Sequence, residues 1–193
     1  MFYRTSVICV IYLSLVHTIQ PSGVQKVGTS IFSVLLPSDW YVQKDNQNDS
    51  IYTCNDHVGN CTPPVGGIPN PGKITIWILG NGGQVGKKRM KNLDELMKYL
   101  FETTRDPLST ANVPLKEADE TQSVRCQVVR SKIGTLGIWS DVYGLEIDKK
   151  LIRVGVMYHE DPKTNDVVRR TTLDILSSIT LLKDPIHKSG AKN

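Results

Sequence analysis

The stretch from Ser123 to Glu160 limits what this chain of 193 residues can fold into more than any other part of it. Residues 124–128 and 152–158 alternate between apolar and other side chains, whereas residues 136–147 are apolar at most positions of both parities. Because successive side chains of a strand point to opposite faces, these runs predict three strands that bury at least one continuous face. Their short connections favour an antiparallel meander, with the middle strand central and covered on both sides.

Further strands and helices are predicted around this meander. The predicted strands cover residues 31–36, 40–42, 51–53 and 73–79. Asn92 is expected to cap a helix, with Glu95 at the third helical position as in a capping box. A last helix is expected to begin at Asn165 or Asp166 and to bury an apolar stripe that ends at Leu182. The segments expected to be linkers, turns or loops include residues 24–30, 106–114 and 161–165.

The N-terminal residues 1–23 resemble a secretory signal peptide. Arg4 precedes an apolar run at residues 6–16, and no acidic residue occurs before Asp39. The run is shorter than the roughly 20 residues that span a bilayer, so no stable membrane anchor is expected after cleavage. The protein is therefore predicted to be exported, either periplasmic or secreted. The alternative is an ordinary buried first strand.

Length and composition predict one domain after this leader. A chain of 193 residues with 39% hydrophobic and 22% charged residues can bury a single core. Residues 24–183 are predicted to form that domain, and the polar residues 184–193 are predicted to be a disordered tail.

Cys54 and Cys61 are predicted to form a disulfide, because export would place them in an oxidising compartment. The alternative is a metal site built from Cys54, Asp56, His57 and Cys61. Structural zinc sites usually need a second cysteine pair, which is missing here, so no metal or other cofactor is predicted. Cys126 is left unpaired and is expected to behave as a small buried hydrophobic residue.

Residues 54–72 combine these cysteines with several prolines and glycines, a composition that excludes a helix or a ladder strand. They are interpreted as a loop insertion within the single domain. Loops carried on a rigid scaffold are the usual binding elements. The predicted partner-binding residues in this loop are Asp56, His57, Asn60 and Ile68.

The glycine-rich residues 80–87 lie between a predicted strand and a predicted helix, which is where phosphate-binding loops occur. A dinucleotide fingerprint that starts at Gly80 needs glycine where Val85 stands. A Walker loop that ends at Lys87 needs Ser or Thr in the next position, which is a lysine. Both spacings fail, so this segment is predicted to be a flexible connection.

Basic residues are otherwise scattered, and the net charge is only +4. The densest cluster, Lys87-Lys88-Arg89 with Lys91, is interpreted as a solvated approach to a helix. A nucleic-acid-binding protein usually shows a concentrated basic stripe, so no nucleic-acid partner is predicted.

Enzymatic chemistry would require residues gathered from distant strands. His57, His159, Glu160 and Asp141 would have to converge in such a site. His159 and Glu160 are neighbours on a predicted strand and should point to opposite faces, and the serines lack a nucleophile elbow. The sequence therefore predicts no enzyme.

Residues Phe32–Trp40, an apolar strand followed by Pro37 and a nearby tryptophan, and the amphipathic residues Thr171–Leu181 resemble the PsbP-like superfamily, which includes bacterial DcrB-type proteins. The resemblance implies an α+β fold in which an antiparallel β-sheet is flanked by helices, an α/β/α sandwich. It also implies an extrinsic subunit, an adaptor or a partner-binding module.

The expected function is therefore an exported, non-enzymatic protein that binds another protein, as an accessory or immunity-type factor. The alternative is a small hydrolase, or a ligand- or metal-binding carrier that uses the region of Cys54 and Cys61.

Overall fold

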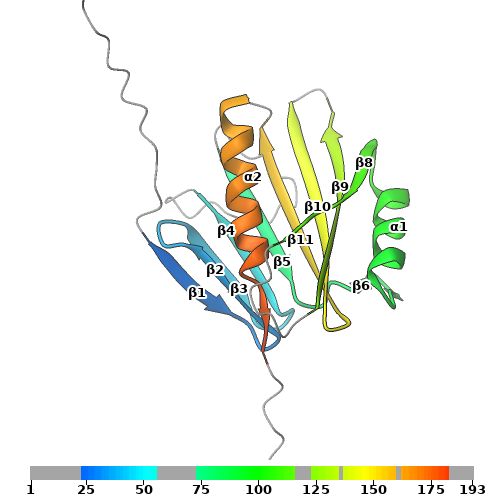
Figure 1. Cartoon of the computed structure of the whole chain (residues 1–193), viewed down its shortest axis with the longest axis horizontal. Helices are drawn as coiled ribbons and strands as arrows, with labels where there is room; N and C mark the ends of the chain where they lie inside the picture. The colour runs from blue at the N-terminus through cyan, green and yellow to red at the C-terminus, as the bar shows by residue number, and fades with distance from the viewer. Residues whose placement is uncertain (1–22, 56–72, 116–122, 135–136, 160–161, 183–193) are drawn as a thin grey trace, which may run out of the picture.

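The computed structural model describes residues 23–55, 73–115, 123–134, 137–159 and 162–182. Across these ranges the protein consists mostly of antiparallel β-sheets, with two helices (Figure 1). The predicted leader up to residue 22, loop residues 56–72 and the predicted tail lie outside the described residues.

A seven-stranded antiparallel sheet forms the centre of the molecule. Its strands lie in the order β3 (Tyr41–Asp45), β4 (Ser50–Cys54), β5 (Ile74–Leu79), β11 (Lys150–His159), β10 (Ile138–Ile147), β9 (Val124–Ile133) and β8 (Pro107–Asn112). The predicted meander is confirmed as β9, β10 and β11, and Ile138 pairs with Ile133 on one side and His159 on the other. The predicted loop at residues 106–114 is wrong, because β8 pairs with β9 there.

A second, three-stranded sheet consists of β1 (Val24–Gly28), β2 (Phe32–Pro37) and β12 (Thr180–Leu181). The prediction of a linker at residues 24–30 is wrong, since β1 pairs with β2 along its whole length. Only Val27 of β1 is buried, so the strand has little apolar periodicity to reveal it. The glycine-rich segment also has regular structure, a hairpin of β6 (Gln84–Val85) and β7 (Lys88–Arg89).

Helix α1 (Leu93–Thr103) begins as predicted. The Asn92 side chain accepts a hydrogen bond from the Glu95 backbone N–H at 2.9 Å, and the Glu95 carboxylate accepts one from the Lys91 N–H at 2.9 Å. These bonds satisfy backbone donors that the first helical turn leaves without a partner.

Helix α2 (Pro162–Ser177) begins earlier than predicted and ends sooner. Proline is favoured at a first helical position, where no backbone N–H is needed, so the predicted turn at residues 161–165 is wrong over its described part. The stripe predicted to extend to Leu182 instead passes from the helix into β12. Its members Val168, Thr172, Ile175, Leu176 and Ile179 are buried.

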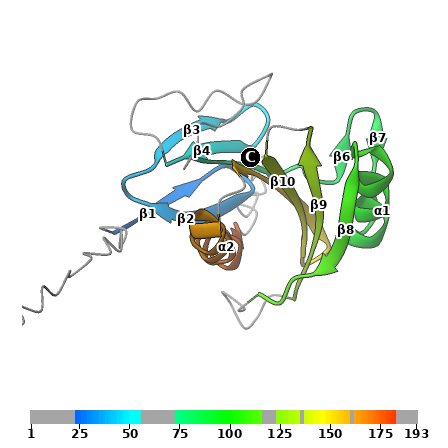
Figure 2. The same ribbon diagram turned by 90° about the horizontal axis from the view of Figure 1, so that it is seen from above.

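The two helices pack against opposite faces of the larger sheet, as Figure 2 shows. On β10, Tyr143 and Leu145 join the main core with α2 and the smaller sheet. Between them, Gly144 faces α1, where a Cβ would lie 2.6 Å from the sulfur of Met97. The prediction that the middle strand is covered on both sides is therefore confirmed. Within the described ranges, no helix has the length and apolar character needed to cross a membrane.

Candidate functional site: a groove and a polar cavity beside helix α2

Helix α2 borders two hollows of different character. The larger is a groove of about 490 Å³ whose walls come from α2, β2 and the turn that follows β2. Its lining is mostly apolar and consists of Val24, Leu35, Leu36, Pro37, Asp39, Trp40, Asn55, Ile74, Val167, Thr171, Asp174, Ile175 and Ser178. A largely apolar hollow with a few polar groups is the usual form of a binding site.

The turn after β2 is held in place by Gln25. Its side-chain amide donates to the Pro37 carbonyl at 3.1 Å and to the Trp40 carbonyl at 3.2 Å. The turn positions Asp39, whose Oδ1 is buried and has no hydrogen-bond partner within the described part of the chain. Desolvating a polar oxygen without a partner is costly, so this position favours a ligand that brings a donor.

The groove also reaches the base of the loop that was predicted to bind a partner. The Asn55 N–H donates to the Ile74 carbonyl at 3.3 Å, and the Ile74 N–H donates to the Asn55 side chain at 2.8 Å. These two bonds join the ends of the loop, and both residues line the groove. The predicted site residues Asp56, His57, Asn60 and Ile68 lie outside the described residues.

Cys54 ends β4 and is 2% exposed, whereas Cys61 lies outside the described residues. The disulfide between them therefore stays a prediction. The third cysteine of the domain, Cys126, is free and buried, as predicted. Its burial raises the pKa of the thiol to about 12, so it remains protonated and poorly reactive at neutral pH.

Thiol titration of the denatured protein is expected to detect fewer reactive thiols before reduction than after, the difference being the two cysteines of the disulfide. Denaturation is needed because Cys126 is shielded in the folded protein. Equal counts would contradict the disulfide. If a chelator then lowered the stability, the alternative metal site of Cys54, Asp56, His57 and Cys61 would be favoured.

The second hollow adjoins an ion pair whose carboxylate is buried. Asp141 is 2% exposed and lies opposite Arg130 in the register of β9 and β10. The guanidinium donates Nε–H to Oδ1 at 2.8 Å and Nη2–H to Oδ2 at 2.7 Å, a bidentate arrangement. These bonds raise the pKa of Arg130 above its ordinary value, so the guanidinium stays charged.

The hydroxyl groups of two tyrosines also contact this carboxylate. The hydroxyl of Tyr158 donates to Asp141 Oδ2 at 3.2 Å, and that of Tyr143 lies 3.5 Å from the same oxygen. Burial, reinforced by the nearby Asp141 charge, raises the pKa of Tyr143 well above its usual range. Both carboxylate oxygens are thus occupied by donors, as a buried charge requires.

Beside this cluster lies a polar cavity of about 230 Å³, large enough for several water molecules or a small polar ligand. It is lined by Arg130, Trp139, Asp141, Tyr143, Tyr158, Asp166, Val168, Arg169 and Thr172. The Thr172 hydroxyl and the Trp139 indole nitrogen are buried and have no partner among the described residues. Arg130 and Lys132 both lie over the Trp139 ring, at 5.8 and 5.5 Å from its centroid.

The residues of the hydrolase hypothesis do not come together where the structure describes them. Asp141 faces the main core with Tyr158, so His159, the next residue of β11, points to the opposite face. His57 and Glu160 lie outside the described residues. Across the described ranges, no three His, Cys, Asp or Glu side chains are placed to hold a metal ion.

Sequence reasoning missed Arg130, Tyr143, Tyr158 and Thr172 as neighbours of Asp141. The available signal was the pair Arg130 and Asp141, one charged residue on each of two largely apolar strands. The two residues lie equally far from the hairpin turn that joins the strands. Such positions are cross-strand partners in an antiparallel hairpin. Neither the protein-family models nor the curated proteins with which this chain was compared gave a match.

Proposed function

We propose that this chain is an exported, non-enzymatic module that binds another protein, and that the groove beside α2 is its recognition surface. The observation that carries the proposal is the apolar groove itself, which joins the base of the predicted binding loop at Asn55 and Ile74.

Exposed apolar side chains support this use of the groove. Val24, Leu35 and Val167 all line it and are 67%, 41% and 59% exposed. Apolar side chains that cluster around a hollow are typical of interaction sites, whereas single exposed ones need no explanation. A partner that covered them would remove their apolar surface from water.

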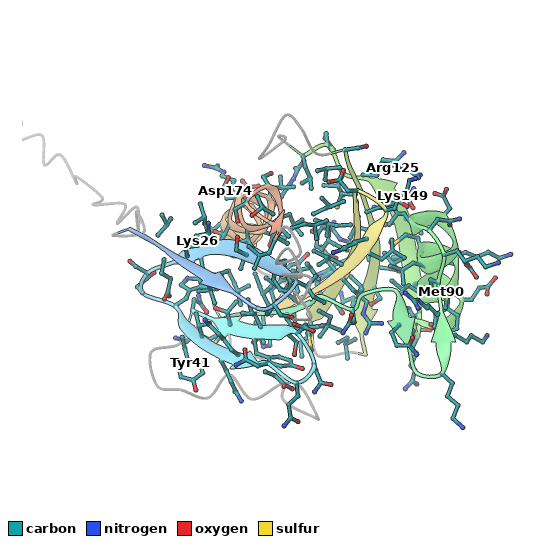
Figure 3. All side chains as sticks on the ribbon, turned by 90° about the horizontal axis from the view of Figure 1, so that it is seen from below. Lys26, Tyr41, Met90, Arg125, Lys149 and Asp174 are labelled. Carbon is teal, nitrogen blue, oxygen red and sulfur yellow. The ribbon has the colours of Figure 1, made fainter. Side chains whose placement is uncertain are left out.

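The charges of the groove indicate which partner would fit. Its lining residues include Asp39 and Asp174 and, among the described residues, no basic side chain; Figure 3 labels Asp174 on α2. Lys26, opposite Leu35 in register, stands outside the lining. The expected occupant is therefore an apolar protein segment that carries a lysine or arginine, whose donors would reach the unpartnered oxygen of Asp39.

The same proposal assigns the fold to the PsbP-like α/β/α sandwiches. It is supported by the helices α1 and α2 on opposite faces of the larger sheet. In the cell, such a protein-binding module would act as an accessory or immunity-type factor. The alternative, a small hydrolase or a carrier that uses the Cys54–Cys61 region, stays a prediction.

The test is an affinity purification from the periplasmic or extracellular extract of the producing cell. The wild-type protein and the variants Leu35→Glu and Leu108→Glu serve as the three baits. Leu35→Glu should abolish recovery of the partner that the wild-type protein retains, because the complex would have to bury the new carboxylate against an apolar segment. For the purified pair, we expect the dissociation constant to rise by about tenfold or more, roughly 1.4 kcal/mol.

Leu108→Glu is the matched control, since Leu108 is 56% exposed on the distant edge strand β8 and does not line the groove. It should retain the partner as well as the wild type does. Recovery of the same partner by all three baits would place recognition elsewhere and contradict the proposal.

A further inference from the structure

A third hollow, of about 940 Å³, lies at another part of the molecule and has a basic lining. Two segments far apart in sequence supply its cations. Arg89 and Lys91 come from the approach to α1, Lys149 comes from the hairpin turn between β10 and β11, and Lys150 is the first residue of β11. Figure 3 labels Met90 and Lys149, one lining residue from each of these two parts of the chain. The sequence revealed only the first of these clusters.

The wall between the two segments is the glycine-rich turn at residues 80–83, which lies directly against β11. A Cβ at Gly82 would stand 2.3 Å from the backbone nitrogen of Arg153, so no other residue fits there without movement of the backbone. The Met90 N–H donates to the Gly83 carbonyl at 2.8 Å and ties the approach to α1 to the same turn. The backbone that carries Arg89 and Lys91 is therefore held close to β11.

Lys149 occupies a backbone conformation that a lysine seldom adopts. Both residues of the turn, Asp148 and Lys149, have positive φ angles, 48° and 67°. Two-residue hairpins of this kind prefer Asn-Gly or Asp-Gly, because a side chain with a Cβ is strained in the left-handed region. A strained residue held at a hollow is an observation from which function can be inferred.

The lining of this hollow contains no acidic residue among the described ones. Arg89, Lys91 and Lys149 form no ion pair within the described ranges. Two acidic residues lie close to these segments in sequence, and neither lines the hollow: the Glu95 carboxylate accepts a hydrogen bond from the Lys91 N–H, and the Asp148 carboxylate accepts one from the Ser123 N–H. Concave surfaces lined by one sign of charge concentrate the opposite ion.

We propose that this hollow binds an anionic ligand with several closely spaced phosphate or sulfate groups. Arg89, Lys91 and Lys149 stand around one depression, where each can approach a different oxyanion group, and lysine and arginine are the usual partners of such groups. Free polyphosphate and a sulfated oligosaccharide share this chemistry. The site shares no lining residue with the groove beside α2, so it stands independently of the proposed partner binding.

The experiment is calorimetric titration of the full-length protein with sodium tripolyphosphate and, separately, with a short heparin-derived oligosaccharide, at about 50 and about 200 mM NaCl. At least one should bind, with an affinity that falls as salt rises. Lys149→Asn should weaken binding by about threefold to tenfold, and adding Arg89→Gln should weaken it further. The probe that binds more tightly identifies the source of the oxyanions.

Lys149→Asn also separates a binding role from a structural one. Asparagine tolerates the left-handed conformation better than lysine, so the melting temperature should stay constant or rise by about 2–4 °C while affinity falls. Lys44→Asn, on the exposed strand β3 and outside the hollow, is the matched control and should leave affinity unchanged. Three results would overturn the proposal: binding of neither probe, equal losses in Lys44→Asn and Lys149→Asn, or binding only to vesicles of anionic lipid.

Discussion

Replacing Asp141 by asparagine is expected to lower the free energy of unfolding by about 3 kcal/mol, because it breaks an ion pair whose carboxylate is buried while keeping the shape of that side chain. In the native protein both carboxylate oxygens accept hydrogen bonds, from the two nitrogens of Arg130 and from Tyr158. An amide in either orientation turns an N–H₂ group toward one of these donors. The Arg130 side chain is 44% exposed, so water can solvate part of its charge and the loss should lie near the low end for buried pairs.

Equilibrium denaturation in urea measures this effect, and the chain offers a matched control. Asp94 also accepts from an arginine, Arg125, at 2.9 Å, but those side chains are 65% and 51% exposed. Asp94→Asn should therefore cost about 1 kcal/mol or less, since exposed pairs contribute little. Equal effects of Asp94→Asn and Asp141→Asn would show that the buried cluster is not the stabilising element inferred from its geometry.

Gly155→Ala is expected to be at least as damaging, with a loss of about 3 kcal/mol or more. Gly155 lies in β11 and pairs with Trp77 of β5, and the indole ring crosses the space where a side chain would stand. A Cβ at this position would be 1.8 Å from a ring carbon of Trp77. Because β11 is an interior strand of the larger sheet, the backbone has little freedom to move away, and the ring has to be displaced.

The melting temperature and the near-ultraviolet circular dichroism of the indole ring would report the damage caused by Gly155→Ala. Trp77→Leu in the same chain removes the ring that clashes, so the double variant should be more stable than the sum of the two single losses predicts. Additive losses in the double-mutant cycle would mean that the glycine is needed for a reason other than the tryptophan.

The parts of this fold that the sequence predicted are those whose side chains alone specify the element. The meander was predictable because Ile152, Val154 and Val156 repeat at period two and all face the main core. The start of α1 was predictable because Asn92 and Glu95 carry the signal locally.

The elements that were missed depend on a neighbouring strand rather than on their own side chains. In β8, five of the six residues are exposed, and the strand forms by pairing with β9 through its backbone. β12 has only two residues, and Thr180 and Leu181 become a strand because β2 lies beside them. Such strands lack the alternation of apolar and polar side chains by which a strand is recognised in a sequence.

The candidate site was only partly predictable for a related reason. The strand prediction placed Asp141 on an apolar strand, but the polar cavity also needs Thr172 from α2, whose packing no local pattern specifies. The groove needs Trp40 and Val167, which belong to opposite ends of the described chain. The basic hollow likewise needs Lys149 beside Arg89, a neighbourhood that only the folded sheet creates.

The pairing of β2 with β12 affects how the chain folds during its synthesis. Ser33 pairs with Thr180, so strand β2, which contributes Phe32 to the main core, lacks one of its neighbours until Thr180 has been synthesised. At about 5–20 residues per second, the ribosome needs on the order of 10 s between the two strands. During that interval the small sheet has an open edge next to apolar side chains, a combination that favours aggregation of a nascent chain.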